Sequence, residues 1–259
     1  MRGGPFVFHD DLDDSCAKAA ALGFDAVELF FHEARSVNVA EVQAVLTAHK
    51  LSVAALGSGA GWVKHKLRLT DPDARVRRRA IEYIARFIEL AAQFNAPVIV
   101  GSMQGGWGDG VSRQQVLSWL ADGLKELGEH AARNKMPLLY EFLNRYETNL
   151  FNNTEDGLAF LRMFHTQNVK LLCDLFHMNI EERDLAGALR MAGEKIGHVH
   201  FADSNRRAVG WGHTDMAPIA AALRDVDYSG YLSAEVIPYP DGDAAARQTM
   251  TSFKKYFPR

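Results

Sequence analysis

Hydrophobic and polar positions along the chain fall into two repeating patterns. Short continuous apolar runs, typical of buried strands, alternate with longer segments whose apolar residues recur at helical spacing. Strands are predicted at 5–8, 26–31, 51–56, 96–101, 137–141, 169–174, 198–201 and 232–236. Helices are predicted at 13–22, 39–49, 72–94, 114–134, 154–165, 184–192, 216–226 and 244–256. The chain therefore reads as eight strand–helix pairs, if the short run at 5–8 is granted as the first strand.

Strand alternating with helix throughout indicates a parallel sheet, because parallel neighbours need a crossover between them. Eight such units with no spare segment favour closure into a single (β/α)8 barrel, a TIM barrel, and the 259 residues are close to the ~250 typical of that fold. We expect one α/β domain over 1–259. An open, doubly wound sheet is the structural alternative.

The composition of the chain bears on whether it binds nucleic acid or membranes. Hydrophobic residues make up 47% of the chain, charged residues 24%, and the formal net charge is −3. These values are ordinary for a globular protein and give no reason to expect nucleic-acid or membrane binding. The densest basic cluster, Arg75 with 77–79, opens a helical pattern and is interpreted as a solvated face.

The cysteines and the N-terminal residues indicate in which compartment of the cell the protein is expected. Cys16 and Cys173 are the two cysteines, and both fall inside predicted elements. Their separation makes a poor disulfide framework or zinc cluster, which favours a reducing compartment. The first residues lack the apolar region of a signal peptide, and no apolar run nears the length of a membrane span. We expect a cytoplasmic protein.

Four consecutive predicted strands end in residues that could bind a metal. They are Glu141, Asp174, His200 and Glu235, with sequence gaps of 33, 26 and 35 residues. Each gap is close to one strand, one helix and two loops. In a parallel barrel the carboxyl ends of the strands share one rim, where such barrels place their chemistry. We therefore expect these four side chains to converge.

The donor types narrow the choice of ion. Three carboxylates and one imidazole suit a divalent cation; we expect Mn²⁺, with Mg²⁺ or Co²⁺ as alternatives. Four protein ligands leave positions for substrate on a five- or six-coordinate ion, so the metal is expected to be catalytic. Taken singly, each acid could cap a helix or face a loop, and His200 could be a satisfied polar group. Their recurrence at equivalent places in four units favours the metal site.

Each of three loops after these strands carries a further polar residue. Glu147 lies six residues after Glu141, and His177 lies three residues after Asp174. Arg206 lies six residues after His200. All three could reach over the same rim toward a substrate. The alternative for each is exposure to solvent or support of the ligands.

Aromatic residues could wall a pocket at this rim. Trp62 and Trp107 lie in glycine-rich loops after predicted strands, and a flat ring can pack on the C–H face of a sugar. Either could instead plug a loop onto the barrel. Glu28 and His9 end earlier strands on the same side and could serve the pocket or the structure.

Three segments resemble a known family: Tyr140-Glu-Phe-Leu-Asn-Arg-Tyr-Glu147, Asp174-Leu-Phe-His177 and His200-Phe-Ala-Asp-Ser-Asn-Arg206. They are similar to the xylose isomerase-like barrels, and most to the D-tagatose 3-epimerase group of ketose 3-epimerases.

The resemblance implies that Glu141, Asp174, His200 and Glu235 bind the metal and that the two glutamates also act as acid and base. It implies that Glu147, His177 and Arg206 bind substrate hydroxyls. Relatives of this kind are often dimers or tetramers, so a homo-oligomer is expected.

On this interpretation the chain is a divalent-metal-dependent ketose 3-epimerase. The ion would stabilise an enediolate, and the two glutamates would exchange protons on its opposite faces. The substrate is expected to be a small sugar. Phe142 stands where the family usually has proline, beside the site, so other reactions stay open. They are aldose–ketose or hydroxypyruvate-type isomerisation, dehydration of an inosose-like or keto substrate, sugar binding without catalysis, and the endonuclease activity of more distant relatives.

Overall fold

A seven-stranded parallel sheet forms the centre of the molecule. The computed structural model describes residues 4–9, 11–108, 110–163 and 168–258. Neighbouring strands in the sheet are neighbours in sequence, and every described pair is parallel. The strands are β1 (Ala26–Phe30), β2 (Ser52–Gly57), β3 (Val98–Val100), β4 (Leu138–Glu141), β5 (Val169–Asp174), β6 (Ile196–His200) and β7 (Leu232–Ser233). The fold is a nearly closed TIM barrel, which confirms the predicted fold class.

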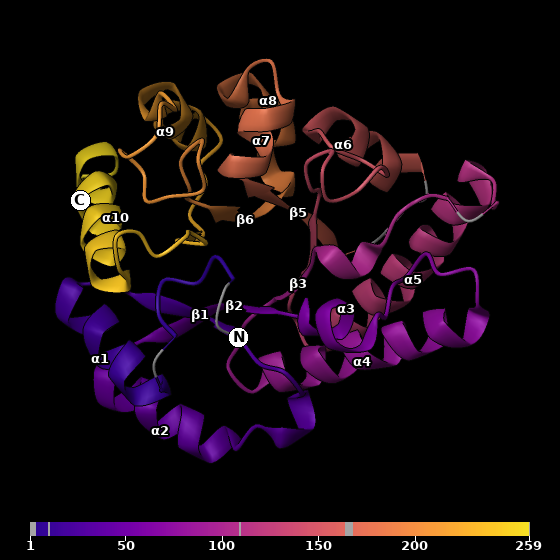
Figure 1. The fold of residues 1–259 in the computed structure, drawn as a ribbon, viewed down its shortest axis with the longest axis horizontal. Helices are drawn as coiled ribbons and strands as arrows, with labels where there is room; N and C mark the ends of the chain where they lie inside the picture. The colour runs from indigo at the N-terminus through magenta and orange to yellow at the C-terminus, as the bar shows by residue number, and fades with distance from the viewer. Residues whose placement is uncertain (1–3, 10, 109, 164–167, 259) are drawn as a thin grey trace.

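Helices surround the sheet (Figure 1). They are α1 (Leu12–Leu22), α2 (Val39–His49), α3 (Ala60–His65), α4 (Ala74–Ala92), α5 (Arg113–Arg133), α6 (Thr154–Met163), α7 (Leu175–Glu181), α8 (Leu185–Ala192), α9 (Met216–Asp225) and α10 (Gly242–Tyr256), with 3₁₀ turns η1 (Ala34–Ser36), η2 (Ser102–Gln104) and η3 (Gly193–Lys195). The first helix, α1, packs against the last, α10. Among the helices described, none combines the length and apolar character needed to cross a membrane.

The first strand, predicted at 5–8, is wrong for the described residues 4–9, which adopt no strand. Pro5 has no backbone N–H to donate to a ladder, and the apolar run is only four residues long. The segment instead fills the seam between the first and last strands. The ring of Phe6 lies 4.9 Å from that of Phe30 at the end of β1, and Val7 packs against Val236 and Ala245 beyond β7.

Other predicted elements differ at their ends. Two short helices, α3 and α7, occupy segments after β2 and β5 that the sequence pattern treats as loops. The strand predicted at 232–236 stops at Ser233, so Glu235 lies in the loop that follows. The predicted end of α6 at His165 lies outside the described residues. Helix α7 begins directly after β5 because Asp174 caps it: the carboxylate accepts the backbone N–H of Phe176 at 2.7 Å.

The interior of the barrel is apolar on one side and polar on the other. Four strands contribute one residue each to an apolar cluster, Ala55, Ile99, Leu139 and Leu172. On the side of β6, β7 and β1, the interior is filled by hydrogen-bonded polar groups that lie directly below the carboxyl-end rim. A larger apolar core lies between the strands and the helices.

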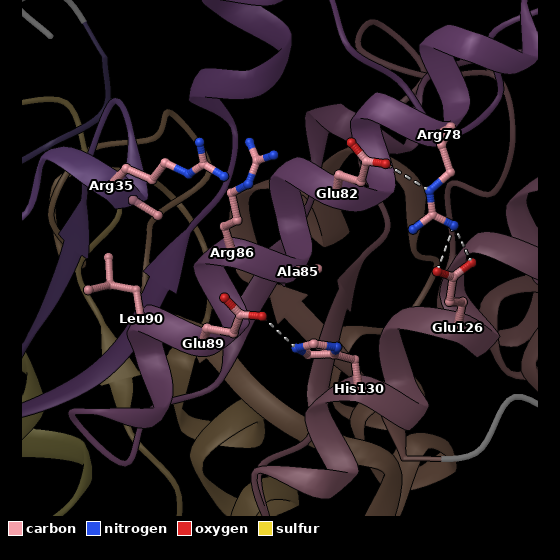
Figure 2. A pocket seen from close by; sticks show the side chains of 10 residues that line it. Arg35, Arg78, Glu82, Ala85, Arg86, Glu89, Leu90, Glu126 and His130 are labelled. Atoms are coloured by element: carbon pink, nitrogen blue, oxygen red, sulfur yellow. Dashed lines mark hydrogen bonds and ion pairs between the residues drawn. The ribbon is translucent and has the colours of Figure 1, made fainter.

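The outer face between α4 and α5 carries paired charges. A groove of about 570 Å³ lies there (Figure 2), lined by arginines, glutamates and a histidine. Arg78 bridges Glu82 and Glu126 at 3.2 and 2.8 Å, and Glu89 lies 3.6 Å from His130. Arg78 belongs to the basic cluster of the sequence, and its exposed position on this face fits the solvated face predicted for that cluster.

The loop between β6 and α9 is organised by one buried carboxylate. Asp203 is 1% exposed and accepts backbone N–H groups from Ser204 at 2.7 Å, Gly210 at 2.8 Å and Thr214 at 3.1 Å. Its own carbonyl accepts the N–H of Arg206 at 2.8 Å. Arg206 has a φ of 58°, in the left-handed region that side chains rarely adopt. Asp203 therefore holds the conformation from which Arg206 reaches the rim.

Replacement of Asp203 by Asn should lower the free energy of unfolding at pH 7 by roughly 1–3 kcal/mol, because an amide cannot accept on both sides. Burial would raise the pKa of Asp203, but backbone N–H donors outweigh burial and hold it below the usual value. Such a group contributes stability above its unfolded pKa and loses it as the pH falls. Urea unfolding should therefore show a full difference between the two proteins at pH 7 that shrinks below about pH 4. A difference that stays constant down to pH 3 would contradict this role.

Candidate functional site

Four polar side chains meet at the carboxyl-end rim. Glu141, Asp174 and His200 are the last residues of β4, β5 and β6, and Asp174 pairs with His200 across the sheet. Glu235 lies two residues beyond the end of β7. One ligand atom from each of the four lies within 4.8 Å of the others. The structure thus brings together the four residues that the strand spacing selects.

The cluster is arranged around one nitrogen. Nδ1 of His200 lies 3.3 Å from Asp174 Oδ2, 3.6 Å from Glu141 Oε1 and 3.7 Å from Glu235 Oε2. Three of the side chains are almost completely buried, and that of Glu235 is 19% exposed. Three carboxylates and one imidazole therefore share a space largely closed to water.

The cluster fits a divalent cation. Oε1 of Glu141 is buried and has no hydrogen-bond partner among the described residues, although carboxylate oxygens accept readily. Burial raises the pKa of Glu235 to about 8; the neighbouring carboxylates of Glu141 and Asp174 add to the rise, and His200 and Arg206 oppose it. Without a bound cation, ionisation of all three carboxylates in this cluster is therefore unfavourable. An oxygen-rich set with one imidazole suits Mn²⁺, Mg²⁺ or Co²⁺.

A second carboxylate supports His200 from inside the barrel. Glu28 Oε1 lies 3.3 Å from Nε2 of His200, and its Oε2 lies 2.9 Å from Nε2 of His198. The ring of His198 also lies 2.9 Å from Ser233 Oγ. Glu28, which the sequence leaves open between pocket and structure, therefore lies beneath the cluster, where it can hold the proton on Nε2 and leave Nδ1 free as a ligand.

The position of Glu141 depends on two neighbours that sequence reasoning missed. A Cβ at Gly101 would lie 2.2 Å from Glu141 Oε2, so only glycine leaves room for the carboxylate. Gln104, fully buried, donates from Nε2 to the carbonyl of Glu141 at 2.9 Å and accepts from Tyr140 Oη at 2.7 Å. A glycine at the last position of the predicted strand 96–101 was the one available signal.

His177 also faces the cluster. It lies in α7 and is fully buried, with Nε2 3.7 Å from Asp174 Oδ2 and 3.9 Å from Glu141 Oε1. On the other side of the ring, Nδ1 is 3.9 Å from Glu147 Oε1. Asn144, which the sequence did not single out, contacts both His177 and Glu147.

Arg206 closes the cluster from the loop after β6. Its guanidinium donates to Glu235 Oε2 and lies 3.5 Å from Glu147 Oε1. It also lies over the ring of Phe176, 5.0 Å from the centroid. The structure therefore joins Glu147, His177 and Arg206 to the four clustered side chains, as the loop positions predict.

Trp107 is held differently. Its indole N–H donates to the carbonyl of Val111 at 2.9 Å, and its backbone is tied to the side chain of Asn149. These contacts place it beside the loop that carries Glu147, with 46% of its surface exposed. They do not bring it into the cluster. Trp62 lies in the short helix α3, half-buried under Lys66.

Comparison with known proteins agrees with the fold and identifies the family. The model of the family described as xylose isomerase-like TIM barrel matches residues 16–256. The chain is 32% identical to the D-psicose 3-epimerase of Agrobacterium fabrum, over 84% of this chain and 76% of that one. It is 30% identical to the L-ribulose 3-epimerase of a Methylomonas strain, over 85% and 76%.

Among solved structures, the 3-keto-D-glucoside 4-epimerase of Escherichia coli superposes with a TM-score of 0.84 and 25% identity, over 96% of this chain and 95% of that one. These relatives are sugar epimerases, which belong to the isomerase class of enzymes. The chain therefore belongs to the xylose isomerase-like TIM barrel family, and it matches the sugar epimerases within that family.

Proposed function

We propose that this protein is a divalent-metal-dependent ketose 3-epimerase acting on a free sugar. One observation carries the proposal: single ligand atoms of Glu141, Asp174, His200 and Glu235 lie within 4.8 Å of one another at the carboxyl-end rim. The 32% identity to a D-psicose 3-epimerase supports the reaction, and the three carboxylates and one imidazole of this cluster support the ion.

The four residues would hold the ion, for which Mn²⁺ is our first choice. When bound, a divalent ion supplies positive charge beside a carbonyl and its neighbouring hydroxyl and so favours loss of a proton from the carbon between them. The orphaned Oε1 of Glu141 and Nδ1 of His200 are the atoms best placed as ligands.

Glu141 and Glu235 are proposed as the acid/base pair. They come from the end of β4 and from beyond β7, with β5 and β6 between them, so their carboxylates approach the centre of the mouth from different sides. One would remove the C3 proton and the other would return a proton to the opposite face, which inverts that carbon. Both carboxylates lie within reach of the same space, since one oxygen of each lies within 4.8 Å of the ligand atoms of Asp174 and His200, and the distance from carboxylate to proton decides whether such a group can act as acid or base.

The remaining polar residues are proposed to bind the sugar hydroxyls. Glu147 and Arg206 contact each other at 3.5 Å, and His177 turns Nε2 toward the clustered carboxylates of Asp174 and Glu141. Trp107 offers an exposed ring face on the adjacent loop for the C–H face of the sugar. Arg206 is already paired with two carboxylates, which favours a free sugar over a phosphorylated one.

Epimerisation at C4 of a 3-keto sugar is the second candidate. Its support is the TM-score of 0.84 with the E. coli 3-keto-D-glucoside 4-epimerase over nearly the full length of both chains. The same pair of carboxylates could exchange a proton on the other side of a C3 carbonyl. The position of the inverted carbon separates the two candidates.

Two further proposals concern the cellular location of the enzyme and its oligomeric state. Cys16 and Cys173 are free, buried thiols, which fits the reducing cytoplasm. A homodimer or homotetramer stays a prediction, to be checked by light scattering of the purified protein.

The function is tested by incubating the Mn²⁺-loaded enzyme with a panel of substrates and separating the products by chromatography. The panel contains D-psicose, D-fructose, L-ribulose, ketose phosphates, hydroxypyruvate and 3-keto glucosides. The proposal predicts a C3 epimer from at least one free ketose. An aldose product would make the enzyme an isomerase, a dehydrated product would make it a lyase, and a C4 epimer would favour the second candidate.

Glu141→Gln and Glu235→Gln should each lower kcat by roughly 10²- to 10⁴-fold at saturating Mn²⁺, because an amide cannot transfer the proton. Steady-state kinetics measure the effect, with bound metal quantified in the same samples. Glu129→Gln, an exposed acid on α5, is the matched control and should keep full activity. Near-normal turnover in either site variant would remove that glutamate from the acid/base pair.

Removal of the ion should abolish activity and lower the midpoint of thermal unfolding, because the buried carboxylates then repel one another. Mn²⁺ at a hundred times its Kd should restore about 2.7 kcal/mol. Asp174→Asn keeps the cap of α7 but removes one charge, and it should lose most of this response. A wild-type midpoint that ignores Mn²⁺ would argue against the site.

Glu28→Gln should weaken Mn²⁺ binding by about 10- to 100-fold without unfolding the protein, because Glu28 orients His200 from behind. Isothermal titration calorimetry measures the affinity. Glu33→Gln is the control, since Glu33 also pairs with a histidine, His65, at 2.6 Å but on the surface. Equal affinities in the wild type and Glu28→Gln would show that the contact does not support the ligand.

A further inference from the structure

One nitrogen of His177 is buried without a partner. Nε2 has no hydrogen-bond partner among the described residues, although the side chain is fully buried. The other nitrogen, Nδ1, lies 2.7 Å from Nδ2 of Asn144 and 3.3 Å from the backbone N of the same residue. The two sides of the ring therefore differ: one is fully engaged by Asn144, and the other faces Asp174 and Glu141.

The orientation of the Asn144 amide follows from its neighbours. Its Oδ1 lies 2.9 Å from the backbone nitrogen of Tyr146, which can only donate. Its Nδ2 lies 3.4 Å from Oε1 of Glu147, which accepts when ionised. Rotation of the amide by 180° would set donor against donor and acceptor against acceptor. Nδ2 therefore faces His177.

The tautomer of His177 follows in turn. Both groups of Asn144 that face Nδ1 are N–H donors, so Nδ1 must be the unprotonated acceptor. A ring turned by 180° would set a carbon against both donors. In the neutral imidazole, the proton is then on Nε2, the nitrogen that points toward the clustered carboxylates.

We infer that Asn144 is a positioning residue that holds His177 as the Nε2–H tautomer, so that His177 donates to an oxygen of the sugar bound beside Asp174 and Glu141. The identity of the acceptor rests on the proposed function; the tautomer does not. Carboxylates dominate the rim, and a fixed neutral donor among them selects an oxygen acceptor on the substrate.

The structure also explains why Asn and not Asp serves at position 144. An aspartate would present an acceptor to Nδ1 and would place a second negative charge beside Glu147. The backbone N–H of residue 144 would still face Nδ1 at 3.3 Å, but the charged carboxylate in the closer position, where Nδ2 now lies at 2.7 Å, makes the stronger hydrogen bond. Nδ1 would then carry the proton, and Nε2 would face the sugar as an acceptor. Asn144→Asp should therefore reverse the tautomer with almost no change in side-chain shape.

The test is a long-range ¹H–¹⁵N correlation spectrum of the full-length enzyme, labelled at histidine and loaded with diamagnetic Mg²⁺. His177→Gln assigns the signals by their loss. In the wild type, Nε2 should give the protonated signal and Nδ1 the unprotonated one; Asn144→Asp should exchange the two. Asn153→Asp is the matched control, because Asn153 lies in the same loop but its Oδ1 accepts the backbone N–H of Asp156 at 2.9 Å at the start of α6, which an aspartate can also do. It should leave His177 unchanged.

A wild-type His177 protonated at Nδ1 would overturn the inference without any variant. A wild-type signal as expected that persists in Asn144→Asp would overturn the role of Asn144. With the ketose that turns over best, Asn144→Asp should raise KM about tenfold or more and change kcat less, because a ground-state hydrogen bond is lost. An unchanged kcat/KM would overturn donation to the sugar. Because the spectrum needs no turnover, failure of the proposed function would leave the tautomer result standing.

Discussion

The repulsion between three crowded carboxylates at the mouth of the barrel, two of them buried, is the constraint on which the rest of the site depends. Glu141, Asp174 and Glu235 share with His200 a space in which every ligand atom lies within 4.8 Å of the others. At an effective dielectric constant of about 20, two like charges about 4 Å apart repel by ~4 kcal/mol. Protonation of Glu235, whose pKa is raised, partly relieves this repulsion. A bound divalent cation would relieve it more completely.

The neighbours of the cluster serve to hold it in that unfavourable state. Glu28 supports His200 from inside the barrel, and Gly101 leaves space for the carboxylate of Glu141. From the solvent side, Arg206 offsets part of the negative charge, in a loop that Asp203 holds in place. Neutral Asn144 organises His177 without adding charge. The polar side of the barrel interior and the rim loops thus form one structure around the proposed ion.

The sequence predicted the four clustered residues because parallel β/α units place every strand end on the same rim, whatever the loops between them do. It failed at 5–8, where packing against Phe30 and Val236 replaced strand pairing. It also missed Gln104, Asn144 and Asp203, whose roles are hydrogen bonds to particular backbone atoms and distant side chains. No periodicity along the chain encodes such contacts. Glu28 could be placed on the rim side but not assigned a partner, since His198 lies 170 residues away.

Solvent-proton exchange is the most direct test of the central claim, that the clustered residues and a bound divalent ion exchange a proton at C3 of a ketose. The enzyme is incubated in D₂O with D-psicose or L-ribulose, loaded with Mn²⁺ or treated with a chelator, and the recovered sugars are analysed by proton NMR after metal removal. The account predicts deuterium at C3 of the epimerised sugar, only in the metal-loaded sample. Epimerisation at C3 that proceeds at the same rate after complete chelation, or without deuterium uptake at C3, would contradict it.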